Sequence, residues 1–267
     1  MSDNILEVRK LDKAFGGLKI LKNVEFDVKR GQRLALIGPN GAGKSTLLNT
    51  IGGQGPATAG TVMFFTKDEK TGAVTAHNIT KMSPNQRLHC GMGKSFQVNN
   101  LFWQFDLLLN IKISIYGSEK SHMHFFGKFD NNKEIEERAE YLLRTVKLWE
   151  KRHEMPGALS YGEQRMLEMA MAFAAKPQMV CLDEPSAGLP TAEVGQFIEI
   201  LKELAKDSTL LFCAHDMDLV FALADEIMVL YFGEILAKGE PKAIANDPRV
   251  QEIYLGGKDD TYDEVRG

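Results

Sequence analysis

The arrangement of apolar and polar residues along the chain predicts two kinds of β-strand. Residues 5–29 alternate the two types, which is typical of half-exposed antiparallel strands. Continuous apolar runs at 33–37, 179–182 and 209–214 instead predict strands that are buried on both faces. Further strands are expected at 60–65, 73–76, 93–97, 227–232 and 234–238, the last two as a hairpin around Gly233.

Helical patterns alternate with the buried strands. Residues 45–51 form a short helical segment that ends at Gly52-Gly53, and 135–146 place apolar residues on one face and charged residues on the other. Two more helices are predicted at 161–173 and 191–206. Because strands and helices alternate, the pattern predicts an α/β fold.

One stretch does not follow either pattern. Residues 100–109 contain more large apolar side chains than one short helix needs for its own core. The stretch is either part of the core or the lining of a groove for a partner helix.

Composition and charge limit the function classes. The chain has 267 residues, 44% of them hydrophobic, and a net charge of −4, so no general affinity for nucleic acid or acidic lipid is expected. No apolar run approaches the length of about 18 residues that a membrane-spanning helix needs. The first residues have neither a basic nor an apolar region, and the three cysteines include no C-x-x-C pair, so we expect a chain of the reducing cytosol.

Residues 38–46 match the G-x-x-x-x-G-K-[ST] pattern of a phosphate-binding loop without substitution. They are Gly38, Pro39, Asn40, Gly41, Ala42, Gly43, Lys44, Ser45 and Thr46. The glycines allow backbone N–H groups to turn towards phosphate, Lys44 can neutralise the β- and γ-oxygens, and Ser45 offers a hydroxyl to Mg²⁺. The helix that follows directs its positive end at the anion, so the sequence predicts an ATP site here.

Two acids follow the buried strand 179–182. A buried strand that ends at Asp183 and Glu184 is hard to explain by folding alone, because each charge needs a partner or solvent. With a phosphate loop upstream, we expect Asp183 to orient Mg²⁺ through its water shell and Glu184 to polarise the attacking water. The alternative is a pair of exposed acids in a turn.

Three single residues are weaker candidates. His215 follows the strand 209–214, where ligands bind in open parallel sheets, so it is expected to contact the γ-phosphate unless it is a structural histidine. Gln97 is either a neutral ligand for Mg²⁺ or the attacking water, or an ordinary amide at a strand end. Phe15, in a predicted turn, either stacks on adenine or plugs the small β-layer.

The segment Leu159-Ser160-Tyr161-Gly162-Glu163-Gln164 begins a helix. Ser160 and Glu163 have the spacing of a capping box, which explains the segment as a helix start. A serine and a glycine at a helix N-terminus also suit an anion, so a binding role stays open.

The order of these motifs along the chain resembles the ATP-binding subunits of ABC transporters. The motifs are the phosphate loop, Gln97, the segment 159–164, Asp183-Glu184 and His215. The resemblance implies a P-loop NTPase core with a parallel-rich sheet, an antiparallel β-subdomain and an inserted helical subdomain. It assigns the core and β-subdomain to 1–98 and 161–238, the helical subdomain to 99–160, and C-terminal helices and a tail to 239–267.

By position, the resemblance implies a role for each candidate. Lys44 and His215 contact phosphate, Glu184 is the catalytic glutamate, and Phe15 stacks on adenine. Mg²⁺ is bound by Ser45, Gln97 and Asp183, with Gln97 also next to the attacking water. Two copies close head to tail, so that Ser160 and Gly162 of one copy face the ATP that the other copy binds.

Within the family, the segments 159–165, 185–189, 215–217 and 233–237 look most like the ATPases of branched-chain amino-acid uptake, with urea and amide relatives close by. The implied partners are a second ATPase subunit, identical or homologous, transmembrane permease subunits that dock near 101–109, and indirectly a solute-binding protein. The implied location is the cytoplasmic face of the inner or plasma membrane.

Some positions depart from the family pattern. Tyr161 replaces a glycine, Glu163 replaces a glutamine, and Pro190 replaces an Asp or Asn. The stretches 67–76 and 123–132 look longer than in a minimal member.

Two other function classes are considered. One is a soluble ABC-type clamp that acts on nucleic acid or ribosomes, but the chain lacks the second phosphate loop and the heptad array of such proteins. The other is a nucleotide-binding regulator without hydrolysis.

Overall fold

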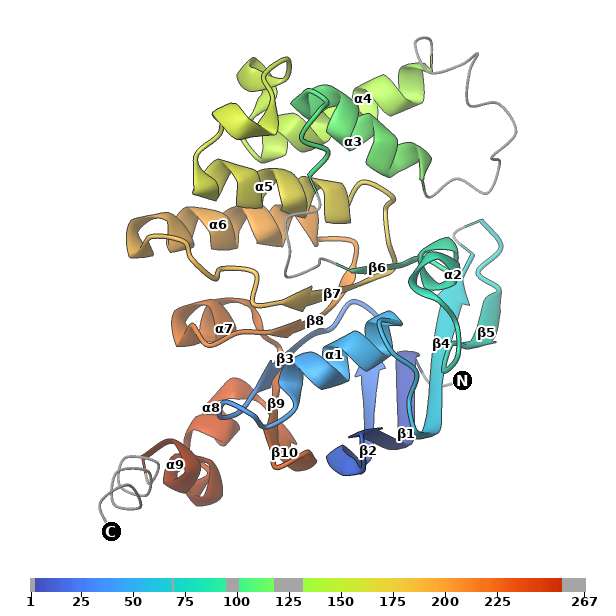
Figure 1. Ribbon diagram of the computed structural model, residues 1–267, viewed down its shortest axis with the longest axis vertical. Coiled ribbons are helices and arrows are strands. Elements are labelled where there is room, and N and C mark those ends of the chain that lie inside the picture. Colours follow the sequence, from blue (N-terminus) through green and yellow to red (C-terminus); the bar gives the residue numbers. More distant parts are fainter. Residues whose placement is uncertain (1–2, 69, 95–100, 118–131, 256–267) are drawn as a thin grey trace.

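Two β-sheets organise the molecule, as a computed structural model describes it for residues 3–68, 70–94, 101–117 and 132–255 (Figure 1). The larger sheet has six strands in the order β10-β9-β3-β8-β7-β6. The strands are β3 (Arg33–Ile37), β6 (Met92–Lys94), β7 (Met179–Asp183), β8 (Thr209–Cys213), β9 (Glu226–Tyr231) and β10 (Glu234–Gly239). All neighbours pair in parallel except β9 and β10, which form the predicted hairpin.

The central strands are covered on both faces, as their continuous apolar runs predict. Leu34 and Leu36 of β3 face one core, whereas Ala35 and Ile37 face the other. Because successive side chains of a strand point to opposite faces, the six-stranded sheet separates two hydrophobic cores.

The first core lies between the large sheet and a second, antiparallel sheet. This sheet has the order β2-β1-β4-β5, formed by β1 (Asn4–Phe15), β2 (Leu18–Lys29), β4 (Ala59–Lys67) and β5 (Val74–Asn78). The helix α1 (Lys44–Gly52) adds Leu47, Leu48 and Ile51 to the same core. A short helix, α2 (Pro84–His89), packs beside β6.

The second core lies beneath a helical layer on the other face of the large sheet (Figure 1). The layer contains α3 (Leu107–Tyr116), α4 (Lys133–Thr145), α5 (Tyr161–Ala172), α6 (Thr191–Leu204) and α7 (Met217–Leu223), with single turns η2 (Trp149–Lys151) and η3 (Pro156–Ala158). The C-terminal helices α8 (Pro241–Ala245) and α9 (Pro248–Leu255) follow β10. The predicted fold, a parallel-rich sheet with an antiparallel β-layer and a helical layer, is confirmed.

The apolar stretch at 100–109 proves to be divided between core and surface. Leu101 and Leu107 are buried in the second core. In contrast, Phe102, Trp103 and Phe105 are 41%, 47% and 39% exposed. The core interpretation therefore holds for Leu101 and Leu107, whereas a groove for a partner helix stays a prediction.

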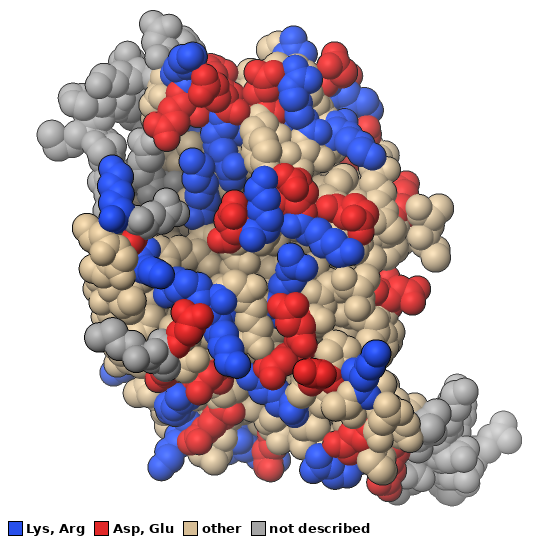
Figure 2. Space-filling model, turned by 180° about the vertical axis from the view of Figure 1, so that it is seen from behind, with Lys and Arg blue, Asp and Glu red and all other residues tan. Residues whose placement is uncertain are grey.

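Charge on the surface is mixed. Figure 2, which shows the face turned away from Figure 1, has Lys and Arg interspersed with Asp and Glu. None of the helices in the described residues is long and apolar enough to cross a membrane.

Candidate functional site

The phosphate-binding loop joins β3 to α1, as predicted. Gly43, with a φ of 103°, is the N-cap of α1 and supplies no side chain to the first turn. Gly38 has a φ of 149°, and a Cβ there would come within 2.1 Å of the Leu230 carbonyl oxygen of β9. Only glycine fits this position, because the loop passes directly over the neighbouring strand.

Lys44 points back into the loop. Its Nζ donates to the carbonyl oxygens of Gly38 at 2.8 Å and Pro39 at 3.0 Å. Burial lowers the pKa of Lys44, while the nearby Cys213, Glu184 and Asp183 oppose that shift. Phosphate oxygens carry more negative charge than carbonyl oxygens, so an ammonium group that exchanges these contacts for phosphate gains stronger charge-assisted hydrogen bonds, and this lysine is well placed to bind an anion.

Asp183, the last residue of β7, lies directly beside the phosphate loop. Its Oδ1 accepts hydrogen bonds from Ser45 Oγ at 3.3 Å and from the Cys213 thiol at 2.6 Å. Burial and the adjacent Asp183 raise the pKa of Cys213, so the thiol remains a neutral donor. A hydroxyl and a carboxylate side by side are the hard oxygen donors that suit Mg²⁺.

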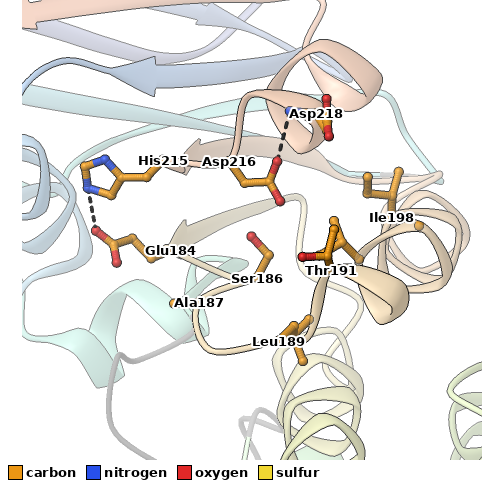
Figure 3. A pocket seen from close by; sticks show the side chains of 11 residues that line it. Glu184, Ser186, Ala187, Leu189, Thr191, Ile198, His215, Asp216 and Asp218 are labelled. Carbon is orange, nitrogen blue, oxygen red and sulfur yellow. Dashed lines mark hydrogen bonds and ion pairs between the residues drawn. The ribbon is translucent and has the colours of Figure 1, made fainter.

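Glu184 and His215 extend from the ends of neighbouring strands. Glu184 has a φ of 48°, and its backbone N–H donates to the Cys213 carbonyl oxygen at 2.9 Å. His215 Nε2 lies 3.0 Å from Glu184 Oε1 (Figure 3). A left-handed backbone at a residue other than glycine is strained, and here it directs a carboxylate away from the sheet towards a histidine.

These two side chains border a cavity of about 520 Å³, into which the loops after β7 and β8 project (Figure 3). Its lining also includes Ser186, Leu189, Thr191, Asp216 and Asp218. Asp216 caps α7 by accepting from Asp218 N at 2.9 Å, which holds the loop after His215 in place. The catalytic candidates therefore lie on ordered turns at one edge of the sheet.

The segment 159–164 forms the predicted capping box at the start of α5. Glu163 N donates to Ser160 Oγ at 3.3 Å, and Ser160 N donates to Glu163 Oε2 at 3.0 Å. Glu193 of α6 lies against Gly162, since a Cβ there would come within 2.1 Å of Glu193 Oε2. Ser160, Gly162 and Glu163 thus make these contacts within the helical layer.

Tyr161 links this segment to the loop after β7. Its hydroxyl donates to the Ala187 carbonyl oxygen at 3.1 Å, and its ring lies against Gly188, where a Cβ would come within 2.8 Å of it. Tyr161, which stands where the family pattern has glycine, therefore connects the start of α5 to the loop after β7. Pro190 is the N-cap of α6 and makes no side-chain cap bond.

Phe15 ends β1 with its side chain 57% exposed, and Lys13 Nζ lies 4.7 Å from the ring centroid. The alternative that Phe15 plugs the β-layer is therefore wrong. The neighbouring strand β2 places Leu21 against Gly43 of the phosphate loop, and Leu21 pairs with Lys13, two residues before Phe15. Gln97 lies outside the described residues, as do residues 123–131 of the second long stretch.

Several contacts of the site have no signal in the local sequence. One is the hydrogen bond from the Cys213 thiol to Asp183. Another is the set of hydrogen bonds that the buried Arg87 makes. Its guanidinium donates to carbonyl oxygens of Thr50 at 2.9 Å and Met82 at 3.0 Å, and also to that of Ile51. Arg87 thereby satisfies the C-terminal end of α1, and burial lowers its pKa to about 10.

Comparison with known proteins agrees with this geometry. A family model described as "ABC transporter" matches residues 21–187, and the chain belongs to this family. A second model, described as "Branched-chain amino acid ATP-binding cassette transporter", matches residues 234–260. Membership confirms the predicted enzyme class, an ABC-type ATPase that binds ATP.

Two relatives cover nearly the whole chain. The chain is 33% identical to the "High-affinity branched-chain amino acid transport ATP-binding protein LivG" of Escherichia coli K12, over 96% of this chain and 99% of the relative. It is also 33% identical to the "Probable branched-chain amino acid transport ATP-binding protein LivG" of Methanocaldococcus jannaschii, over 94% and 97%. Among solved structures, an ATP-binding cassette of an ABC transporter in its ADP conformation has a TM-score of 0.78, at 31% identity and 95% and 99% coverage.

Proposed function

We propose that the protein is the ATP-hydrolysing subunit of an ABC importer for branched-chain amino acids or a related small polar solute. Two ATPase subunits close head to tail on two MgATP and drive separate transmembrane subunits, which receive the solute from a binding protein. The names of the relatives and the C-terminal family match support this substrate class. The subunit then works at the cytoplasmic face of the membrane.

The pairing of Glu184 with His215 carries the proposal for hydrolysis. Glu184 Oε1 is the base that accepts a proton from the attacking water, and His215 Nε2, at 3.0 Å, holds that carboxylate in position. When ATP binds, His215 also contacts the γ-phosphate. Lys44 exchanges its two carbonyl contacts for the β- and γ-oxygens, which neutralises charge as the bond breaks.

The residues beside Lys44 fit Mg²⁺. Ser45 would offer its hydroxyl to the ion and Asp183 would act through bound water, with Gln97 as the third candidate. Bound Mg²⁺ supplies charge neutralisation on the β- and γ-phosphates. Phe15, whose ring is exposed, is the proposed stacking surface for the adenine.

The proposed dimer supplies a cover for the phosphates from a second subunit. Ser160 lies exposed at the N-terminus of α5, and Ser160 and Gly162 of a second subunit provide that cover in the closed dimer. The helix N-terminus then presents its positive end to the γ-phosphate of the facing nucleotide.

The exposed aromatic turn before α3 is the proposed contact with the permease. Phe102 and Phe105 have ring centroids 6.3 Å apart, and Trp103 lies between them in the sequence. The buried side chain of Asn110 donates to the carbonyl oxygens of Phe102 at 3.1 Å and Phe105 at 3.0 Å, which keeps the turn rigid. A rigid apolar surface suits a helix of a membrane subunit.

A Glu184→Gln variant tests the catalytic assignment. The amide cannot accept the proton, so turnover is expected to fall by about a hundredfold or more, while ATP binding persists. In size-exclusion chromatography with MgATP, the variant should accumulate as a dimer. Glu226→Gln, a change at a partly exposed glutamate on β9, serves as the control. Unaltered turnover of Glu184→Gln would refute the assignment.

A further inference from the structure

The carboxylate of Glu163 has two partners. Its Oε2 accepts the backbone N–H of Ser160 in the capping box at 3.0 Å, and its Oε1 lies 2.7 Å from Lys151 Nζ. Glutamine would satisfy the first contact equally well, because its amide oxygen accepts the same hydrogen bond. The negative charge at position 163 is therefore not needed to cap the helix.

Lys151 comes from a separate, well-anchored turn. It ends η2, where Lys151 N donates to the carbonyl oxygen of the buried Leu148 at 3.0 Å. The guanidinium groups of Arg144 and Arg152 lie 5.0 Å and 4.6 Å from the ring centroid of Trp149 in the same turn. Lys151 thus reaches the start of α5 from a fixed position in the helical layer.

The two side chains keep each other charged. The hydrogen bond from Lys151 lowers the pKa of Glu163, and the same bond raises the pKa of Lys151. A second carboxylate, Glu193, lies against Gly162 on the same segment. Without Lys151, the start of α5 would present two negative groups together.

Such a surface would repel the negatively charged triphosphate of a nucleotide, because like charges brought together at an interface weaken binding. We propose that Lys151 is a positioning residue that cancels the charge of Glu163, so that the start of α5 can accept the phosphates of a nucleotide bound by a second subunit. This inference rests on the proposed head-to-tail function. Lys151 itself touches neither nucleotide nor water in the reaction; it acts through Glu163.

Three variants of the full-length chain test the proposal: Lys151→Met, Glu163→Gln and the double variant. For Lys151→Met, we expect the ATP concentration at half-maximal turnover to rise about fivefold, with a smaller change in kcat. For Glu163→Gln, the ATP concentration at half-maximal turnover should stay within about twofold of the wild-type value. The double variant should return to the wild-type value, because neither charge is left. Added salt should reduce the defect of Lys151→Met, since screening weakens repulsion between exposed charges.

Lys206→Met is the matched control, because it breaks an exposed ion pair of similar length, with Glu203 at 2.8 Å on α6. It should leave the ATP dependence unchanged. The proposal is overturned if Lys151→Met behaves as Lys206→Met does, or if its defect persists in the double variant. A wild-type chain that neither hydrolyses ATP nor dimerises would instead refute the proposed function, so the two failures are distinguishable.

Discussion

The two walls of the proposed ATP site are built in different ways. On the phosphate-loop wall, Lys44 and Asp183 are buried and held by contacts between residues far apart in sequence. On the wall formed by the start of α5, Ser160 and Tyr161 are exposed and held by a capping box, one hydroxyl and one surface ion pair. On the first wall, Lys44 and Asp183 are held by burial, whereas the groups that we propose to face a second chain lie on a lightly supported helix end.

The largest effect should come from the first wall. His215→Ala removes the partner of the Glu184 carboxylate, so we expect kcat to fall by about a hundredfold to a thousandfold. The free energy of unfolding should hardly change, because the His215 side chain is half exposed. Steady-state ATPase assays and urea unfolding measure the two quantities. His153→Ala, at an exposed histidine 3.4 Å from Asp106, is the control, and equal kcat losses in both variants would contradict the assignment.

A second change should affect the folding of that wall. Arg87→Met leaves the carbonyl oxygens at the end of α1 without their donor, and Arg87 is only 2% exposed. We expect a loss of about 3 kcal/mol in the free energy of unfolding, measured from the urea midpoint. Arg249→Met breaks an exposed pair with Asp247 and should cost at most about 0.5 kcal/mol. Similar midpoints for the two variants would show that Arg87 does not support α1.

The smallest effect is expected on the second wall. Tyr161→Phe keeps the ring against Gly188 and removes only the hydroxyl that donates to the Ala187 carbonyl oxygen. The free energy of unfolding should fall by about 0.5 kcal/mol, because this bond is exposed. Tyr141→Phe, which removes a hydroxyl bonded to Glu203 at 2.8 Å, is the matched control for stability. If Tyr161→Phe lost more free energy of unfolding than Arg87→Met, the comparison between the two walls would be reversed.

Much of the fold follows from local pattern. The apolar run at 179–182 and the alternation in 5–29 predict a buried parallel strand and an antiparallel layer, and the structure has both. The capping box at Ser160 was also predictable, because both partners lie within one helical turn. The stretch 100–109 was ambiguous, since an apolar residue facing solvent and one facing the core look alike in sequence.

The sequence by itself determined the chemistry and its order along the chain: a phosphate loop, a strand that ends in Asp183-Glu184, and a histidine after the next strand. These are local patterns, set by residue type and spacing. Only the tertiary structure decided that Cys213 donates to Asp183, that Arg87 supports α1, and that Lys151 neutralises Glu163. Such contacts depend on which strands and helices become neighbours, and that follows from the packing of the two cores rather than from any short segment.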